Sequence, residues 1–537
     1  MKRLRKEINK NGKSQKQPQK PAQGRQTKRQ GTSAGKSRSQ QAAEREEQIS
    51  RKKTTSDGES KNRQKKASAG NSGRPYFIVS YLFIGIFLSL IAYLVYFNVT
   101  QKETYLSDSH NTRQKDYAEK VIRGSIISSD GVELARTDVD EEGNETRVYP
   151  YDNLFAHVVG YLSKGSSGLE ATENYQLLES HANPLEQLKN EFKDQKNIGD
   201  NVITTLNSHM QQVAYDALGD HKGAVIALEP DTGRVLVSVS KPSFNPNTID
   251  EDWESLNADS DSGVFLNRGL QGQYPPGSTF KIVTALAYLR QNQTLDGFSF
   301  DCEGELTNGG YTIHCAGNNV HGQQDFYSAF ANSCNTAFAT IGLSLDKGAF
   351  QTLADSLYLN SRLDLELPTS RSSFSVDDST ADALMMQTSI GQGNTLVTPM
   401  EMALITAAVA NDGVMMKPYF VDRIEAYDGT QVKEYSSERL SEVMSSSEAD
   451  QLTKLMLGVV ENGTASSLND LGYNIAGKTG SAEHGDMTED THSWFAGFSN
   501  AEDPDLVVVV IAEAAGGGSA VATPIARQVF QAYYGDR

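Results

Sequence analysis

Cysteine is scarce in this sequence, with three residues among 537. So few cysteines exclude a disulfide framework as the main support of the fold. Cys302 and Cys315 flank a glycine-rich stretch that can turn back as a hairpin, so a single disulfide between them stays open. A metal site is less favoured, because these two thiols and His314 do not repeat a zinc-ligand spacing. We therefore expect no metal ion and no cofactor.

Long apolar runs are also rare, and residues 76–97 are the exception. These 22 residues carry no formal charge. As a helix they would span about 33 Å, which matches the hydrocarbon core of a bilayer. A cleaved signal peptide would have a shorter apolar region, of about 7 to 15 residues, and a small-residue cleavage site, which does not follow Phe97. We therefore expect an uncleaved transmembrane helix.

Acidic residues are few in the first 75 residues, which contain 22 Lys and Arg against 6 Asp and Glu. Of the 50 basic and 68 acidic residues in the chain, the remainder carries 28 and 62, so a tail of about +16 precedes a body of about −34. The basic flank lies N-terminal to the apolar segment. The positive-inside rule then predicts a single-pass membrane protein with a cytoplasmic N-terminus and an extracytoplasmic body.

Residues 1–74 also lack large apolar side chains, so they cannot bury enough surface to offset chain entropy. We expect this basic tail to be disordered. It could contact anionic lipid head groups or nucleic acid. A solvated tail that only sets the membrane orientation is favoured, and no nucleic-acid partner is expected.

Two parts follow the apolar segment. Residues 98–200 are polar, with short apolar runs and turn signals, and predict a small membrane-proximal domain of strands with a connecting helix. Residues 201–537 have strand patterns at both ends and helical patterns between them. They predict one α+β domain that is large enough for a substantial core.

The stretch from Tyr274 to Lys281 reads YPPGSTFK, and an amphipathic helical pattern follows it. The prolines and glycine stop any preceding element, which places Ser278 at a helix start, where the helix dipole favours negative charge on its oxygen. Lys281 projects from the same face, so a neutral amine there can take the hydroxyl proton. Ser-x-x-Lys occurs five times in the chain, so the context rather than the motif distinguishes Ser278.

A second short motif, Ser333-Cys334-Asn335, lies in a stretch with a helical pattern. Read in isolation, such a motif more often satisfies nearby backbone groups than performs chemistry. The functional interpretation gives Ser333 a proton-relay role and lets the Asn335 amide hold a substrate peptide group and the lysine.

A third motif, Lys478-Thr479-Gly480 followed by Ser481, lies in a strand-like run. Its glycines let a ligand approach the backbone, and an extended peptide could add itself to the strand edge. A lysine and a hydroxyl at such an edge can bind a carboxylate. The tripeptide alone would more often be an ordinary surface strand with a bulge.

The order of the three motifs, with separations of about 50 and 140 residues, resembles that of penicillin-binding proteins and class A β-lactamases. Flanking segments match too, among them SIGQG at 389–393 and SWFAGF at 493–498. Cysteine replaces aspartate at position 334. In the membrane-proximal part, RGSI from Arg123 and GSSGLE from Gly165 resemble the pedestal of the class B, monofunctional branch. The resemblance covers essentially the whole part beyond the apolar segment.

The resemblance implies a transpeptidase domain with the penicillin-binding-protein and serine β-lactamase fold. It implies that Ser278 attacks the D-Ala-D-Ala carbonyl of a peptidoglycan stem peptide, and that Lys281 takes its proton. An amine from a neighbouring stem then resolves the acyl-enzyme into a cross-link, and β-lactams acylate the same serine. Ser333 would relay the proton, and the substrate would be bound by Asn335, Lys478, Thr479, Gly480 and Ser481.

The family also implies a place in the bacterial cell membrane and a partner, a membrane glycosyltransferase of the shape, elongation, division and sporulation (SEDS) class. Two alternatives stay open. A D,D-carboxypeptidase or β-lactamase-like hydrolase would use the same acyl-enzyme, although no glutamate stands out as the activator of a deacylating water. A β-lactam-sensing receptor or inactive scaffold would be expected to have lost one of the three motifs.

Overall fold

The computed structural model describes residues 74–100, 118–259, 261–484 and 487–535. The chain divides into two compact units, Met1–Ile86 and Phe87–Arg537. The tail expected to be disordered, residues 1–74, lies outside the described residues except for its last position. The candidate catalytic segments all lie in the larger unit.

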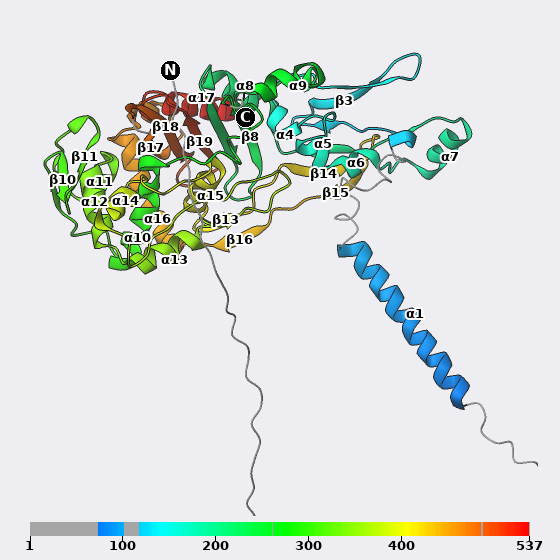
Figure 1. Ribbon diagram of the computed structural model, residues 1–537, viewed down its shortest axis with the longest axis horizontal. Coiled ribbons are helices and arrows are strands. Elements are labelled where there is room, and N and C mark those ends of the chain that lie inside the picture. Colours follow the sequence, from blue (N-terminus) through cyan, green and yellow to red (C-terminus); the bar gives the residue numbers. More distant parts are fainter. Residues whose placement is uncertain (1–73, 101–117, 260, 485–486, 536–537) are drawn as a thin grey trace, which may run out of the picture. The chain divides into compact units, whose positions relative to one another are not determined.

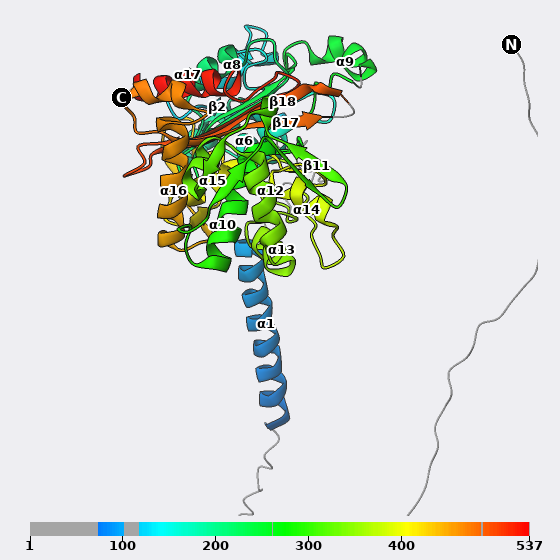
Figure 2. The same ribbon diagram turned by 90° about the vertical axis from the view of Figure 1, so that its left-hand side faces the viewer.

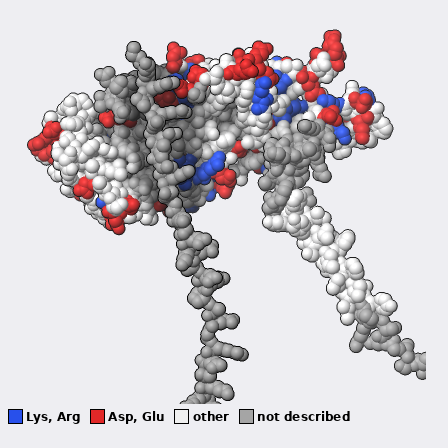
Figure 3. Space-filling view, in the orientation of Figure 1, with Lys and Arg blue, Asp and Glu red and all other residues white. Residues whose placement is uncertain are grey.

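Helix α1 (Arg74–Thr100) contains the apolar segment. Within the described ranges it is the one helix long and apolar enough to cross a membrane, over Tyr76–Phe97. Its side chains between these residues are exposed almost throughout and carry no charge, as Figure 3 shows. A helix that is apolar on every side is stable in an apolar surrounding such as a bilayer. By length and composition, α1 is therefore the candidate membrane span that the sequence predicted.

A five-stranded antiparallel sheet forms the centre of the larger unit, in the order β17-β18-β19-β7-β8. Residues of β7 and β19 are buried along the whole of both strands, because helices cover both faces of the sheet. The order leaves β17 at an edge. The strands are β7 (Gly223–Leu228), β8 (Val235–Lys241), β17 (Ala476–His484), β18 (Met487–Ser499) and β19 (Leu506–Ala512).

Helices lie on both sides of this sheet (Figures 1 and 2). On one face α8 (Ser208–Leu218) packs beside α17 (Ala522–Gly535), and on the other α15 (Pro399–Ala410) contacts three strands. Every residue of α15 is buried, which explains why this helix has no polar face. With α15 lie α10 (Lys281–Asn292), α11 (Phe326–Ala331), α12 (Asn335–Ser344), α13 (Lys347–Ser356), α14 (Asp382–Ser389) and α16 (Ser446–Glu461).

A second, six-stranded sheet has the order β15-β14-β6-β2-β3-β4. Its strands are β2 (Ile126–Ile127), β3 (Glu133–Val139), β4 (Glu145–Val148), β6 (Asn201–Thr204), β14 (Val421–Glu425) and β15 (Gln431–Glu434). β6 pairs in parallel with β2 and antiparallel with β14. Strands from both sides of residue 200 therefore share one sheet. Beside it lie the short helices α4 (Ala156–Val159), α5 (Gly168–Thr172), α6 (Asn174–Leu178) and α7 (Pro184–Phe192).

Glu170 in α5 is fully buried between two arginines. Its carboxylate oxygens accept from Arg123 Nε and from Arg147 Nε, each at 2.7 Å. Burial alone would raise the pKa of the Glu170 carboxyl, but the two guanidinium groups lower it below its usual value. Glu170 is therefore ionised, and it joins the two short motifs, RGSI and GSSGLE, that the sequence singled out in this part of the chain.

We expect Glu170→Ala to lower the free energy of unfolding by about 3 to 5 kcal/mol, because it leaves two buried guanidinium groups without their carboxylate. Urea denaturation of the detergent-solubilised chain, followed by circular dichroism, measures the change. Glu133→Ala is the control, because Glu133 pairs with Arg136 at 3.8 Å on the exposed surface and such pairs contribute little. Equal losses in the two variants would contradict the role of the buried carboxylate.

Most local predictions are confirmed. The patterns that follow residue 200 are β6, α8, β7 and β8, and the strand pattern near the other end is β19. The glycine-rich stretch is a hairpin of β10 (Glu305–Asn308) and β11 (Tyr311–His314). The disulfide left open is not formed, since Cys302 and Cys315 are free thiols with sulfur atoms 3.6 Å apart. The prediction of a helix at Ser333 is wrong, because α11 ends before this residue and α12 begins after it.

Candidate active site

Ser278 lies in a short 3₁₀ helix, η1 (Gly277–Phe280), that continues directly into α10. Gly277 has a φ of +52°, and a Cβ there would lie 2.8 Å from the carbonyl oxygen of Ser481. Only glycine avoids both the left-handed strain and this contact. Ser278 is half-buried, and no residue in the described part of the chain hydrogen-bonds to its hydroxyl. The hydroxyl is therefore free to meet a substrate.

Lys281 lies one helical turn further on and is fully buried. Its Nζ donates to the Ser333 carbonyl oxygen at 2.7 Å, to Asn335 Oδ1 at 2.8 Å and to Ser333 Oγ at 3.3 Å. The expected contact of the amine with Ser278 is thus replaced by contacts with the second motif. Burial lowers the pKa of Lys281 to about 7. A large fraction of this amine is then neutral near neutral pH, as a general base must be.

Ser333 occupies the turn between α11 and α12, with a φ of +55°. This conformation is uncommon for residues other than glycine, and such strain gathers at functional sites. The Ser333 hydroxyl accepts from Lys478 Nζ at 2.9 Å as well as from Lys281. The Asn335 side-chain amide makes two hydrogen bonds. Its Oδ1 accepts from Lys281 Nζ, and its Nδ2 donates to the His314 carbonyl oxygen at 3.0 Å. The second motif therefore links both lysines.

Lys478 reaches Ser333 from β17, across 145 positions of sequence. It is fully buried, and its Nζ also donates to the Thr479 carbonyl oxygen at 3.1 Å. Burial, and then the charge of Lys281, lower the pKa of Lys478 well below its usual value. Neither lysine has a carboxylate partner within the ranges that the structure describes. A substrate carboxylate would supply the missing negative charge.

The outer edge of β17 carries the rest of the third motif. Thr479 Oγ1 lies 2.5 Å from Thr464 Oγ1, so the threonine rotamer is held. A Cβ on Gly480 would lie 3.0 Å from the side chain of Trp494, which explains the need for glycine. Ser481 is exposed. Because β17 is an edge strand, an extended peptide can pair with its backbone at these residues.

The structure thus brings the three motifs together, since hydrogen bonds connect Lys281, Ser333, Asn335 and Lys478, and Thr479 to Ser481 follow on the same strand. The sequence did not predict the two aromatic rings that lie beside the two lysines. The rings of Phe338 and Phe330 lie 5.3 and 5.7 Å from Nζ of Lys281 and Lys478, respectively. Apolar residues in a helical pattern give no sign of such a role, because any core helix shows the same pattern.

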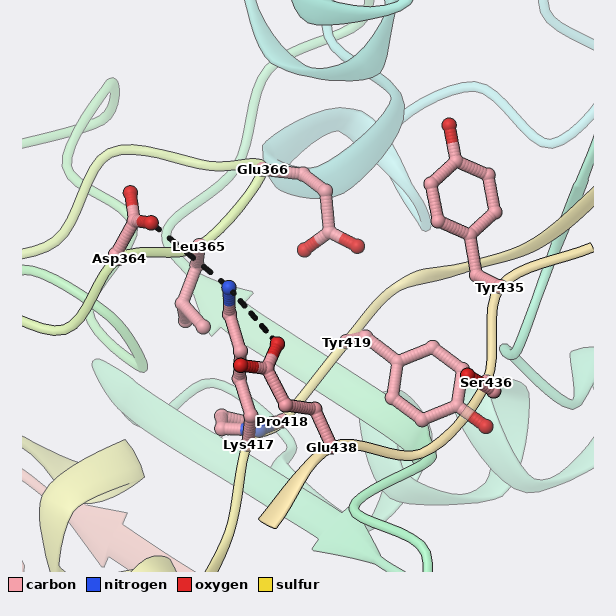
Figure 4. Close-up of a pocket in the computed structure, with 9 residues that line it drawn as sticks. All are labelled: Asp364, Leu365, Glu366, Lys417, Pro418, Tyr419, Tyr435, Ser436 and Glu438. Carbon is pink, nitrogen blue, oxygen red and sulfur yellow. Dashed lines mark ion pairs between the residues drawn. The ribbon is translucent and has the colours of Figure 1, made fainter. Parts of the chain in front are cut away.

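A hollow elsewhere on the larger unit is lined by none of these residues (Figure 4). Lys417 Nζ lies there between Asp364 and Glu438, at 3.8 and 3.7 Å from their carboxylate oxygens. Glu366 projects into it, and burial raises the pKa of its carboxyl. The lysine is paired with two carboxylates, and the residues of the three motifs do not line this hollow, so it does not compete with the Ser278 site.

Comparison with family models gives two matches. The model described as the penicillin binding protein transpeptidase domain matches residues 223–531, and the model described as the penicillin binding protein A dimerisation domain matches residues 123–202. The two matched ranges do not overlap, and both lie in the larger unit.

Curated relatives and solved structures agree with these models. The chain is 34% identical over 444 residues to the peptidoglycan D,D-transpeptidase PbpA of Mycolicibacterium smegmatis, covering 76% of this chain and 88% of that one. PbpA of Mycobacterium tuberculosis H37Rv is 30% identical over 496 residues, which cover 84% and 97% of the two chains.

Among solved structures, the ceftriaxone acyl-enzyme complex of penicillin-binding protein A from M. tuberculosis superposes with a TM-score of 0.71 at 30% identity, over 78% of this chain and 99% of that one. A D,D-transpeptidase domain from Eggerthella lenta gives 0.70 at 32% identity, over 77% and 98%. With the three motifs joined at one site on this fold, the chain belongs to the class B penicillin-binding proteins, the monofunctional peptidoglycan D,D-transpeptidases.

Proposed function

We propose that this chain cross-links peptidoglycan stem peptides by acyl transfer through Ser278. The observation that carries the proposal is the convergence of two buried lysines, Lys281 and Lys478, on the hydroxyl of Ser333. One lysine is placed one turn after a serine with a free hydroxyl, and the other lies on an edge strand that can take a peptide. This arrangement suits a serine nucleophile and a substrate that ends in a carboxylate.

In the proposed reaction the Ser278 oxygen attacks the carbonyl carbon of the D-Ala-D-Ala bond while neutral Lys281 accepts the hydroxyl proton. The backbone N–H groups of Ser278 and Ser481 stabilise the oxyanion, and each such donor contributes on the order of 3 kcal/mol. Ser333 passes a proton to the leaving amine, since its hydroxyl contacts both lysines. The C–N bond breaks and terminal D-Ala leaves.

In this proposal the third motif, which begins at Lys478, and Asn335 bind the substrate. Lys478 and Thr479 bind the terminal carboxylate, and the peptide pairs with the edge of β17 near Gly480. The Asn335 amide holds Lys281 and a peptide group of the substrate. An amine from a second stem then attacks the acyl-enzyme carbonyl, forms the cross-link and releases the serine.

The pH dependence of acylation follows from Lys281. Because the amine must be neutral and its pKa is about 7, the acylation rate should rise with pH and level off above neutrality, falling about tenfold for each pH unit below the pKa. Stopped-flow acylation by a chromogenic cephalosporin measures this profile. A rate that is flat between about pH 5.5 and 8.5 would contradict the role of Lys281 as base.

The activity itself is tested with a donor stem peptide ending in D-Ala-D-Ala, with and without a D-amino acid acceptor. Transpeptidation predicts that D-Ala release is accompanied by the acceptor-linked product, which mass spectrometry detects. Release that yields only the hydrolysed peptide would favour a D,D-carboxypeptidase. Rapid loss of a penicillin adduct would favour a β-lactamase.

The placement of the enzyme is part of the same proposal. Helix α1 anchors the chain in the bacterial cell membrane, residues 1–74 lie in the cytoplasm, and the transpeptidase domain of residues 201–537 lies outside. The membrane-proximal part, residues 98–200, serves as a pedestal that contacts a SEDS-class glycosyltransferase. Protease protection of a tag at the N-terminus of the full chain in intact spheroplasts tests the orientation, and digestion of that tag would overturn it.

A further inference from the structure

All three cysteines of the chain gather with one histidine next to the second motif. The sulfur atoms of Cys302, Cys315 and Cys334 and a ring nitrogen of His321 all lie within 4.8 Å of one another. The three thiols are buried, with at most 2% of each residue exposed, and the histidine is half-buried. The set combines soft thiolate ligands with an imidazole, which is the ligand type that Zn²⁺ prefers in closed structural sites.

The distances fit one ion at the centre of a tetrahedron. With Zn–S of about 2.3 Å and Zn–N of about 2.1 Å, tetrahedral ligands are separated by about 3.8 Å for two sulfurs and about 3.6 Å for sulfur and nitrogen. The Cys302 and Cys315 sulfurs lie 3.6 Å apart and the Cys315 and Cys334 sulfurs 3.8 Å apart. His321 Nδ1 lies 3.4 Å from the sulfur of Cys302.

The surroundings fit a metal centre better than a disulfide. A bond between any two of the cysteines would leave the third thiol and His321 without a role, whereas one ion uses all four groups. The hydroxyl of Thr336 donates to the sulfur of Cys302 at 3.2 Å and lies 3.3 Å from the sulfur of Cys334. Such hydrogen bonds to ligand sulfurs orient the ligands of metal centres.

We propose that Cys302, Cys315, His321 and Cys334 bind one structural Zn²⁺ ion. This revises the expectation that the chain holds no metal, which weighed His314 as the histidine ligand. In the structure, His314 Nδ1 lies 3.6 Å from a carboxylate oxygen of Glu305 and is not part of the cluster. His321 and Cys334 lie beside Cys302 and Cys315 instead.

The ion would join four backbone segments around the second motif. Cys302 ends β9 (Phe300–Cys302) and pairs with the start of β12 (Gly322–Gln324), directly after His321. Cys315 directly follows β11, and Cys334 is the residue before α12. With the ion bound, Ser333 and Asn335 are held on both sides of a metal ligand. The site would thus fix the strained turn that presents these groups to Lys281.

The first test is the metal content of the full chain, purified in detergent without chelator. We expect inductively coupled plasma mass spectrometry to find about one equivalent of zinc per chain. A strong chelator should remove the zinc and lower the Tm of the protein, and added Zn²⁺ should restore the Tm. Replacement by Co²⁺ should give the absorption of a tetrahedral thiolate site. These readouts need neither an active enzyme nor a variant.

Variants then locate the ion. The double variant Cys302→Ser with Cys315→Ser should reduce zinc to below about 0.1 equivalent, since only two ligands remain, and His321→Ala should weaken binding in a competition with a coloured chelator. His221→Ala is the matched control, because His221 is exposed and outside the cluster, and it should keep the full equivalent. A wild-type chain with no bound metal after dialysis against Zn²⁺, a disulfide among these cysteines, or zinc retained by the double variant would overturn the proposal.

Discussion

Replacing Ser278 with alanine is expected to abolish covalent labelling by a fluorescent penicillin, with a loss of about 10⁵-fold or more in the acylation rate. Ser333 is not expected to take its place, since its hydroxyl is engaged with both lysines. Because no described residue hydrogen-bonds to the Ser278 hydroxyl, the substitution removes no internal contact. The Tm should therefore stay close to that of the wild type.

Ser344→Ala is the matched control for this experiment. Ser344 begins another Ser-x-x-Lys copy, and its hydroxyl only donates to the Ile341 carbonyl oxygen at 2.6 Å near the end of α12. This variant should be labelled like the wild type. Undiminished labelling of Ser278→Ala would sink the assignment of the nucleophile, and loss of labelling in both variants would show that the assay reports folding rather than chemistry.

Lys281→Met is expected to lower the acylation rate by about 10³-fold, because it removes the base while keeping a side chain of similar length. Removing this buried amine relieves its desolvation cost but also removes its three hydrogen bonds. These two effects oppose each other, so the Tm should change little. Labelling time courses together with thermal unfolding measure both effects. A large loss of rate at unchanged Tm separates a chemical role from a structural one.

Lys281→Arg distinguishes proton transfer from charge. A guanidinium keeps a positive charge near Ser333 but does not lose its proton in proteins. If Lys281 acts as the base, this variant should be as slow as Lys281→Met, and its residual rate should not rise with pH around neutrality. Near-normal acylation by Lys281→Arg would mean that the site needs only a cation there. Lys347→Met, in the Ser-x-x-Lys copy that begins at Ser344, is the matched control and should react like the wild type.

Several parts of this protein could be predicted because their signals are local. The uncharged run of α1 is as long as a bilayer is thick, and two prolines and a glycine before Ser278 leave a helix start as the natural continuation. The run of valines in β19 identifies a strand that is buried on both faces. In each case the neighbours in sequence determine the backbone conformation.

Other parts depend on contacts between residues that are far apart in the chain. The helical pattern around Ser333 gave no sign of the turn at this residue, where tertiary contacts with both lysines accompany a φ of +55°. Local propensity is a weak constraint when burial and hydrogen bonds favour another conformation. The shifted pKa of Lys281 likewise follows from its complete burial, which no motif encodes.

By itself, the sequence determined the candidate membrane span, the place of Ser278 at a helix start and the family, because these depend on local order along the chain. The tertiary structure alone decided that Lys478 meets Ser333 from 145 positions away and that His321, rather than His314, joins the three cysteines. The physical reason is the same for both. Which side chains converge is settled by how sheets and helices pack, and packing sums many weak contacts over the whole domain.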